Sequence, residues 1–182
     1  MKKIIVIGCM GSGKSTFAEK LHRKTKIPLF HLDNIWWKAD RTHISREEFD
    51  SELNRIIQGD SWIIDGDSKR TYAARLEKCD TENFLDYTAK QSMEGIRTRD
   101  GKVRADKPSD ENELSAELVE LVKGYRVQTR PKVLELIAAH GDVECRIFNR
   151  REQADAWLRS LPPQLYSTFR SACCFRSRVL DC

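Results

Sequence analysis

A glycine-rich stretch near the N-terminus constrains the fold more than any other part of the chain. Residues 8–16 read Gly-Cys-Met-Gly-Ser-Gly-Lys-Ser-Thr, which fits the pattern G-x-x-x-x-G-K-[ST] without a mismatch. An apolar run of buried-strand character, residues 3–7, comes directly before it. Backbone N–H groups in such a turn can point at phosphate oxygens, and a helix opening at Lys14 adds the positive end of its dipole. The stretch therefore predicts a strand, a phosphate-binding loop and a helix.

The residue types of this loop suit a nucleoside triphosphate bound with Mg²⁺. We expect the ammonium group of Lys14 to reach the β- and γ-phosphates of ATP, and the hydroxyl of Ser15 to bind Mg²⁺. An ordinary glycine-rich turn with an exposed lysine is the alternative, but it does not account for the full pattern between a strand and a helix. The other residues expected to cradle the phosphates are Gly8, Gly11, Ser12, Gly13 and Thr16.

Length and composition indicate one soluble domain. A chain of 182 residues can form one catalytic unit with its own core but is short for two. No apolar run approaches the roughly 18 residues of a membrane helix, and cleaving the N-terminus as a signal peptide would destroy the phosphate loop. We therefore expect a cytoplasmic protein, and a monomer. The six cysteines include no C-x-x-C pair, which argues against a zinc site.

The distribution of charge argues against a nucleic-acid surface. Residues 1–161 hold 29 basic and 27 acidic residues, and these are interleaved along the chain. A nucleic-acid-binding surface normally concentrates its basic residues in a stripe. Direct binding to nucleic acid is therefore not expected.

Short apolar segments alternate with helical patterns over most of the chain. This alternation predicts a parallel sheet joined by right-handed crossovers and covered on both faces, a three-layer α/β/α fold that binds ligands at the carboxyl ends of its strands. The predicted strands are residues 3–7, 29–32, 62–64, 83–85 and 143–148. The predicted helices are residues 14–24, 45–58, 69–78 and 90–97, a pair within 113–138, and 151–161.

Two segments fall outside this pattern. Residues 98–112 are polar, contain Gly101 and Pro108 and have little to bury, so we expect a short mobile lid. Pro162 and Pro163 end the last helical pattern, and the residues after them show no period. We therefore expect one domain over residues 1–161 and a C-terminal tail over residues 162–182.

Four segments in this order resemble the adenylate-kinase-like branch of P-loop kinases, and within it the bacterial DNA topology modulation proteins. They are residues 7–16, 31–38, 62–71 and 84–87. The resemblance extends to about residue 161. It implies a P-loop fold like that of nucleoside monophosphate kinases, with ATP and Mg as cofactors. The phosphate acceptor of that family is poorly defined, so the resemblance leaves the acceptor open. The chain departs from the family after the fourth strand and after Pro108, which concerns lid closure more than nucleotide binding.

Three residues after predicted strands are candidates for catalysis and binding. Asp33 can orient an acceptor hydroxyl in line with the γ-phosphate, or it can cap a following helix. Asp65 would hold Mg²⁺, usually through water, or cap a turn. Arg70 follows Asp65-Gly66 in a segment that resembles the Asp-Gly-aromatic-Pro-Arg signature of nucleoside monophosphate kinases with one residue added. That resemblance implies the Mg²⁺ role of Asp65 and a phosphate-binding role for Arg70, for which the alternative is a solvated charge.

Aromatic and basic residues complete the predicted site. Trp36 and Trp37 lie just past Asp33, where an aromatic face could stack on a base or sugar, and one of the two is expected in the core instead. Arg99 and Arg104 lie in the predicted lid, where arginine forks could close on the charge that develops in the transition state. The alternative for both arginines is a solvated position in a charged loop.

Two functions agree with these features. The first is an ATP-dependent phosphotransferase that moves the γ-phosphate to a nucleotide-like or hydroxylated acceptor. The second is a nucleotide-binding regulatory protein that acts on DNA topology or on a protein partner without turnover. The regulatory protein would need Lys14 and Ser15 but not Asp33. The presence of Asp33, Asp65 and the lid arginines on one chain therefore favours the kinase.

Residues 162–182 are predicted to be dispensable, because the tail offers no apolar face that could pack on the domain. Truncation after Leu161 should leave the melting temperature and the nucleotide affinity nearly unchanged. Both quantities can be measured on the truncated and full-length proteins side by side. A drop of several degrees on truncation would show that the tail packs on the core.

Overall fold

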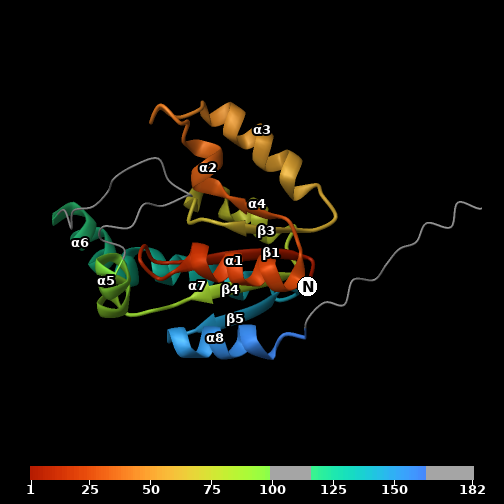
Figure 1. Ribbon diagram of the computed structural model, residues 1–182. Coiled ribbons are helices and arrows are strands. Elements are labelled where there is room, and N and C mark those ends of the chain that lie inside the picture. Colours follow the sequence, from red (N-terminus) through yellow and green to blue (C-terminus); the bar gives the residue numbers. More distant parts are fainter. Residues whose placement is uncertain (99–115, 163–182) are drawn as a thin grey trace, which may run out of the picture.

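One parallel sheet forms the centre of the molecule. A computed structural model describes residues 1–98 and 116–162 of the 182-residue chain (Figure 1). Its strands follow the order β2-β3-β1-β4-β5, and all neighbouring pairs are parallel. The predicted five-stranded parallel sheet is therefore confirmed. The strands are β1 (Lys3–Gly8), β2 (Leu29–His31), β3 (Trp62–Asp65), β4 (Thr81–Leu85) and β5 (Glu144–Phe148).

The central position of β1 determines where a ligand can bind. After β1 the chain crosses to one side of the sheet to form β2 and β3, and then to the other side to form β4 and β5. The carboxyl end of β1 is therefore a topological switch point, where the connections on either side diverge and leave a crevice. The glycine-rich loop begins at this point.

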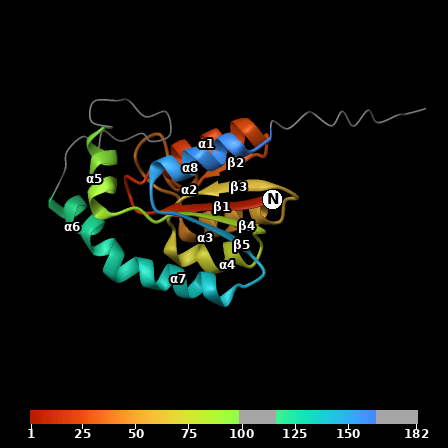
Figure 2. The same ribbon diagram turned by 90° about the horizontal axis from the view of Figure 1, so that it is seen from below.

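Helices cover both faces of the sheet, which gives three layers (Figure 2). One face carries α1 (Lys14–Thr25) and α8 (Arg151–Ser160), and the other carries α3 (Arg46–Ile57), α4 (Tyr72–Leu76) and α7 (Arg130–Ala139). A 3₁₀ turn, Lys69–Thr71, precedes α4. In the part of the chain described, no helix combines the length and the hydropathy of a membrane span. The remaining helices are α2 (Leu32–Trp36), α5 (Ala89–Arg97) and α6 (Ala116–Gly124).

Apolar side chains fill the space on both sides of the sheet. Along β1, Ile5 and Ile7 join the cluster under α3, α4 and α7, whereas Ile4 and Val6 join the cluster under α1 and α8. This division follows from the alternation of side chains along a strand. A strand that is buried on both faces needs a continuous apolar run, and residues 4–7 provide one.

Capping residues fix the start of two helices. Ser45 and Glu48 form the predicted capping box of α3: Ser45 Oγ accepts from the Glu48 N–H at 3.1 Å, and Glu48 Oε2 accepts from the Ser45 N–H at 2.8 Å. Thr88 and Gln91 form a second capping box at the start of α5, which was not predicted. The second box fixes where α5 begins, close to the glycine-rich loop.

The helical run from Ala116 to Ala139 is continuous, whereas the sequence pattern predicts a pair of helices. A π-helical turn, Tyr125–Thr129, joins α6 to α7, and the Arg130 N–H bonds to the Tyr125 carbonyl five residues earlier. Pro131 follows at once and has no N–H to donate, so the regular α-helical ladder is interrupted in this region. The wide turn buries the side chains of Tyr125 and Thr129.

A buried carboxyl group lies in the middle of the sheet. Glu82, on β4, is 0% exposed and accepts a hydrogen bond from the Tyr72 hydroxyl of α4. Burial raises the pKa of Glu82 to about 7 from its usual 4.5, although the hydrogen bond from Tyr72 and the charge of Arg75 act in the opposite direction. The folded protein therefore holds a proton on Glu82 at pH values where the unfolded chain has released it.

This difference predicts a pH-dependent stability. Below pH 4.5 Glu82 is protonated in both the folded and the unfolded chain. As the pH rises through about 7, the stability that the protonated carboxyl group contributes to the folded protein is lost. Glu82→Gln keeps an acceptor for Tyr72 but cannot ionise. The free energy of unfolding of Glu82→Gln, taken relative to that of the wild type, should therefore increase by on the order of 2 kcal/mol between pH 5 and pH 8.

Urea unfolding at several pH values measures this gain. Glu77→Gln is the matched control, because Glu77 is exposed and its replacement changes the net charge equally. A Glu82→Gln difference that stays constant across this pH range would contradict the prediction.

Candidate functional site

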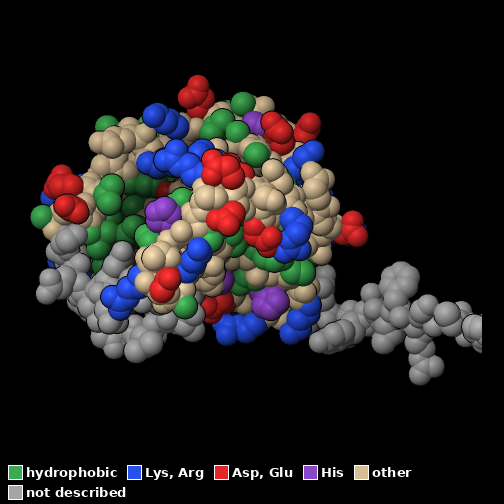
Figure 3. Space-filling model, turned by 90° about the horizontal axis from the view of Figure 1, so that it is seen from above, with side chains coloured by type: hydrophobic (Ala, Val, Ile, Leu, Met, Phe, Trp, Pro, Cys, Tyr) green, Lys and Arg blue, Asp and Glu red, His purple; other side chains and the backbone are tan. Residues whose placement is uncertain are grey.

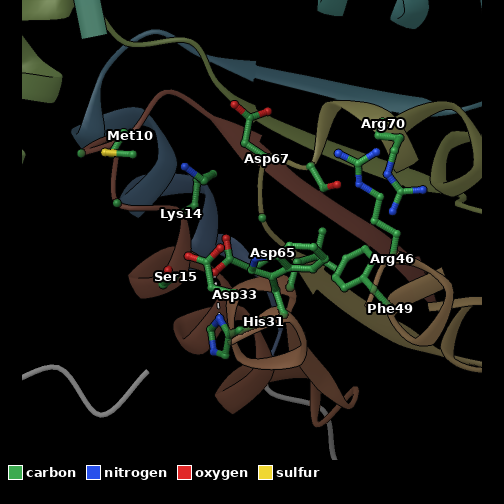
Figure 4. Close-up of a pocket in the computed structure, with 16 residues that line it drawn as sticks. Met10, Lys14, Ser15, His31, Asp33, Arg46, Phe49, Asp65, Asp67 and Arg70 are labelled. Carbon is green, nitrogen blue, oxygen red and sulfur yellow. Dashed lines mark hydrogen bonds and ion pairs between the residues drawn. The ribbon is translucent and has the colours of Figure 1, made fainter. Parts of the chain in front are cut away.

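A cavity of about 510 Å³ opens at the carboxyl ends of β1, β2 and β3, and it lies within the size range of small-molecule sites. The surface is hollowed on the face shown in Figure 3, and Figure 4 shows the lining side chains. These come from the loop after β1, the β2–α2 junction, the start of α3 and the loop after β3. The lining residues are Met10, Gly11, Gly13, Lys14, Ser15, His31, Leu32, Asp33, Trp36, Arg46, Phe49, Asp65, Gly66, Asp67, Ser68 and Arg70.

The loop between β1 and α1 has the backbone shape of a phosphate cradle. Gly11 and Gly13 have φ values of 79° and 87°, in the left-handed region that favours glycine. A Cβ at Gly11 would lie 2.1 Å from the Ser92 carbonyl oxygen, so a larger residue would push α5 away from the loop. Gly13 is the N-cap of α1 and has no side chain, which leaves the first N–H groups of the helix available to an anion.

The residues expected to bind the nucleotide divide into two groups. Gly8 and Ser12 are buried and do not line the cavity, and Thr16 is exposed outside it. A Cβ at Gly8 would lie 2.7 Å from the Leu85 carbonyl oxygen, so this glycine lets the loop start close to β4. The cavity is lined by the others, which are Gly11, Gly13, Lys14 and Ser15.

Lys14 and Asp67 bring opposite charges to the loop end of the cavity (Figure 4). The Lys14 ammonium group donates to the carbonyls of Gly8 at 2.9 Å and Cys9 at 3.2 Å. Asp67, which was not predicted as a site residue, follows β3 and is half-buried. Burial raises the pKa of its carboxyl group, and the charge of Lys14 opposes that shift. The signal in the sequence was its place two residues beyond Asp65, in the loop at a strand end.

Asp65 and His31 lie side by side at the ends of neighbouring strands. They are partners in the β2–β3 register, so their side chains emerge on the same face of the sheet. His31 Nδ1 donates to Asp65 Oδ2 at 2.8 Å, which holds the carboxylate in one orientation. The other oxygen, Asp65 Oδ1, is buried and has no hydrogen-bond partner among residues 1–98 and 116–162. An acceptor oxygen left in this way at the wall of a cavity suits a cation or a water bound to one.

Asp33 belongs to a short helix that was not predicted. It is the second residue of α2, whose N-cap is His31, so the alternative role of Asp33 as an N-cap is wrong. Asp33 is exposed and lines the cavity with Asp65 and Ser15. Figure 4 shows these three side chains close to one another, on the side of the cavity nearest α1.

The opposite end of the cavity is basic and aromatic. Arg46 and Arg70 lie beside Phe49 in Figure 4, with the Arg70 guanidinium 5.9 Å from the centre of the Phe49 ring. Both Arg70 Nη atoms donate to Asp50 at 2.7 Å, and this pair is exposed. Trp36 packs edge-on against Phe49 at 5.7 Å and lines the same cavity. The cavity therefore has carboxylates beside the phosphate loop and guanidinium groups at the far end.

Arg75 fixes the loop that follows β3. Its side chain is completely buried, and it donates to the carbonyls of Gly66 and Ser68 at 3.0 Å each. Burial lowers the pKa of the guanidinium, and the nearby carboxyl groups, Asp67 first, oppose this. Because Asp65 directly precedes this loop and Asp67 belongs to it, Arg75 helps to hold the acidic wall of the site in place. The sequence gives no sign of this role, since a lone arginine on a helix usually lies in solvent.

An ion pair joins a buried aspartate to a half-buried arginine. Asp86, the first residue after β4, accepts from Arg130 Nε at 2.8 and 2.9 Å and pairs with Arg130 Nη2 at 2.8 Å. Neither residue lines the cavity. The pair ties the carboxyl end of β4 to α7. The predicted lid arginines, Arg99 and Arg104, lie outside the residues that the structure describes.

The donor set fits Mg²⁺ bound together with a phosphate. Carboxylate and hydroxyl oxygens are the ligands that Mg²⁺ prefers, and in phosphate sites it uses only one or two protein ligands with water and phosphate. Ser15 and Asp65 line the cavity, and in the described part of the chain Asp65 Oδ1 has no hydrogen-bond partner. Within residues 1–98 and 116–162 there is no cluster of three or more His, Cys, Asp or Glu side chains that could hold a metal. In a phosphate site of this kind, water and phosphate oxygens would supply the remaining ligands.

Fold and cavity together define a P-loop protein of the α/β/α type found in small kinases. The chain is similar in structure to shikimate kinase from Bacteroides thetaiotaomicron, with a TM-score of 0.56, 15% sequence identity, and coverage of 86% of this chain and 93% of that one. It is also similar to shikimate kinase from Acinetobacter baumannii in complex with shikimate, with a TM-score of 0.58, 15% identity, and coverage of 87% and 92%.

These likenesses show the fold. The chain matches no protein-family model, and no curated protein matches its sequence. Membership of the DNA topology modulation family, which the sequence resemblance implies, is therefore not supported. The P-loop fold that the same resemblance implies is confirmed.

Lys14→Ala is predicted to weaken binding of Mg-ATP about tenfold or more without unfolding the protein, because it removes the ammonium group nearest the phosphate loop. The increase in melting temperature with rising Mg-ATP concentration measures the affinity. Lys132→Ala is the matched control, since Lys132 is exposed on α7 away from the cavity. Equal stabilisation of the wild type and Lys14→Ala would count against the role of Lys14.

Proposed function

We propose that the protein is an ATP-dependent phosphotransferase that moves the γ-phosphate of ATP to a small nucleotide-like or hydroxylated acceptor. One observation carries the proposal: a single cavity contains a phosphate loop, the carboxylates of Asp33, Asp65 and Asp67 beside it, and guanidinium groups at its far end. A protein that only binds a nucleotide needs the first of these. A kinase needs all three, since the acceptor must be held in line with the phosphate that it receives.

In this proposal Lys14 and the N–H groups of the loop bind the β- and γ-phosphates. Ser15 and Asp65 hold Mg²⁺, which when bound neutralises charge on the phosphates. His31 keeps the Asp65 carboxylate oriented through its 2.8 Å hydrogen bond. Gly8 and Ser12, which are buried outside the cavity, are proposed to act through the shape of the loop, and Thr16 is proposed to act from the exposed first turn of α1.

Asp33 is proposed to accept a hydrogen bond from the acceptor hydroxyl and to orient its oxygen toward the γ-phosphate. Its exposed carboxylate, on the wall shared with Ser15 and Asp65, supports this role. Arg99 and Arg104 are proposed to close on the transferring phosphate from the lid, as the sequence suggests. The protein is further proposed to act as a cytoplasmic monomer.

The far end of the cavity is proposed to hold the rest of the acceptor. Trp36 and Phe49 offer apolar ring surface, and Arg46 and Arg70 offer donors to an anionic or polar group. Asp50 holds both Nη atoms of Arg70, so an anionic acceptor has to share this guanidinium with Asp50 or displace it. Solvent screens an exposed ion pair of this kind, so a bound anion can replace Asp50 at little cost.

Asp33→Asn tests the proposal. The amide keeps the size of the side chain but accepts a proton poorly, so turnover should fall about a hundredfold or more while Mg-ATP affinity stays unchanged. Release of ADP is followed by a coupled assay over a panel of nucleotides, nucleosides and hydroxylated acids. Asp60→Asn, an exposed change at the amino end of the sheet, is the control.

The outcome separates the two functions. If the wild type binds Mg-ATP but transfers phosphate to no member of the panel, the regulatory alternative is favoured. If Asp33→Asn transfers phosphate as fast as the wild type, Asp33 does not belong to the acceptor site.

A further inference from the structure

Arg151, the first residue of α8, reaches the phosphate loop from behind. Its Nη1 donates to the Ser12 carbonyl at 3.2 Å, and its Nη2 donates to the Gly11 carbonyl at 2.9 Å. The same Nη2 donates to the Gln91 carbonyl of α5 at 3.1 Å. One guanidinium thus joins the loop to two helices that follow β4 and β5. Arg151 does not itself line the cavity.

The surroundings leave this guanidinium little room. Its Cζ lies 5.4 Å from the centre of the Tyr87 ring, which packs against one side. A Cβ at Gly95 of α5 would lie 2.3 Å from Arg151 Nη2 and 2.0 Å from the Gly11 carbonyl oxygen. A Cβ at Gly13 would lie 2.9 Å from Arg151 Nη1. Glycine at both positions allows the loop, α5 and Arg151 to meet this closely.

The contacts determine which way the loop points its N–H groups. In a trans peptide the C=O and the N–H point in opposite directions. When Arg151 holds the Ser12 carbonyl, the Gly13 N–H of the same peptide unit must point away from Arg151. The Ser12 N–H is already used, since it donates to the Cys9 carbonyl at 3.1 Å. The direction of the Gly13 donor therefore depends on a residue that lies outside the cavity.

We propose that Arg151 is a positioning residue of the phosphate loop. By holding the Ser12 carbonyl it aims the Gly13 N–H at the phosphates of the bound nucleotide. By holding the carbonyls of Gly11 and Gln91 it keeps the turn of the loop and α5 in place against each other. The inference rests on the proposed nucleotide binding and is independent of the acceptor. Arg151 lies outside the motif at residues 8–15, and the inference gives it a part in the affinity of the loop for phosphate.

The substitution Arg151→Lys distinguishes a positioning role of Arg151 from a purely electrostatic one. A lysine keeps the positive charge near the loop, but its compact ammonium group lacks the planar fork that spans three carbonyls. If Arg151 acts only through its charge, Arg151→Lys binds phosphate as well as the wild type does. If it acts by geometry, Arg151→Lys loses affinity nearly as much as Arg151→Met.

The test measures the dissociation constants of Mg-ATP and of Mg-tripolyphosphate by calorimetry for Arg151→Lys and Arg151→Met, well below the melting temperature of each variant. Mg-ATP and Mg-tripolyphosphate should each bind about tenfold more weakly to both variants than to the wild type. Tripolyphosphate has no base or sugar, so an equal loss assigns the effect to the phosphates. Arg150→Lys and Arg150→Met, at the exposed neighbouring position, should change neither constant.

Several results would overturn the inference. These are full affinity in Arg151→Lys, a loss for Mg-ATP without a loss for Mg-tripolyphosphate, or a lower melting temperature with unchanged affinity in both variants. Arg151→Lys alone decides the matter if Arg151→Met does not fold. A wild type that binds Mg-tripolyphosphate but not Mg-ATP would refute the proposed function. In that case the affinities of the wild type and the Arg151 variants for Mg-tripolyphosphate would still decide the role of Arg151. A wild type that binds neither ligand would refute both.

Discussion

A site that binds phosphate through backbone N–H groups has to turn the attached carbonyls away from the ligand and still give each of them a donor. In this protein cationic side chains from three helices donate to backbone carbonyls of the two loops at the cavity. Lys14 and Arg151 hold carbonyls of the loop after β1, and Arg75 holds carbonyls of the loop after β3. The three helices lie on both faces of the sheet, so the cavity depends on the whole three-layer arrangement.

The parts of the fold that could be predicted are those with a local cause. The apolar run before Gly8, the glycine pattern and the capping box at Ser45 each act within a few residues, and the structure has the expected elements at all three. The short helix α2 has five residues, too few to show a helical period. The π-helical turn could not be predicted either, because its residues are regular in sequence and its extra width serves burial of Tyr125.

The candidate site shows the same division. Asp65 could be predicted because it ends an apolar strand, and strand ends of parallel sheets meet at one edge. Its partner His31 could not, because their contact depends on the register between β2 and β3. Arg75 and Arg151 were missed for a related reason. Both bind backbone carbonyls, and a carbonyl leaves no mark on the sequence that would identify its partner.

The π-helical turn determines the direction in which the Arg130 side chain leaves the helix, because it adds one residue before Arg130. The α-helix advances about 100° around its axis with each residue, so the one additional residue of a π turn rotates everything that follows by that amount. With this turn in place the guanidinium meets Asp86 at the carboxyl end of β4. Without it, the same side chain would leave the helix about a quarter turn away, and the buried carboxylate would lose its counter-charge. The spacing between α6 and Arg130 is therefore as much a part of the ion pair as its two residues are.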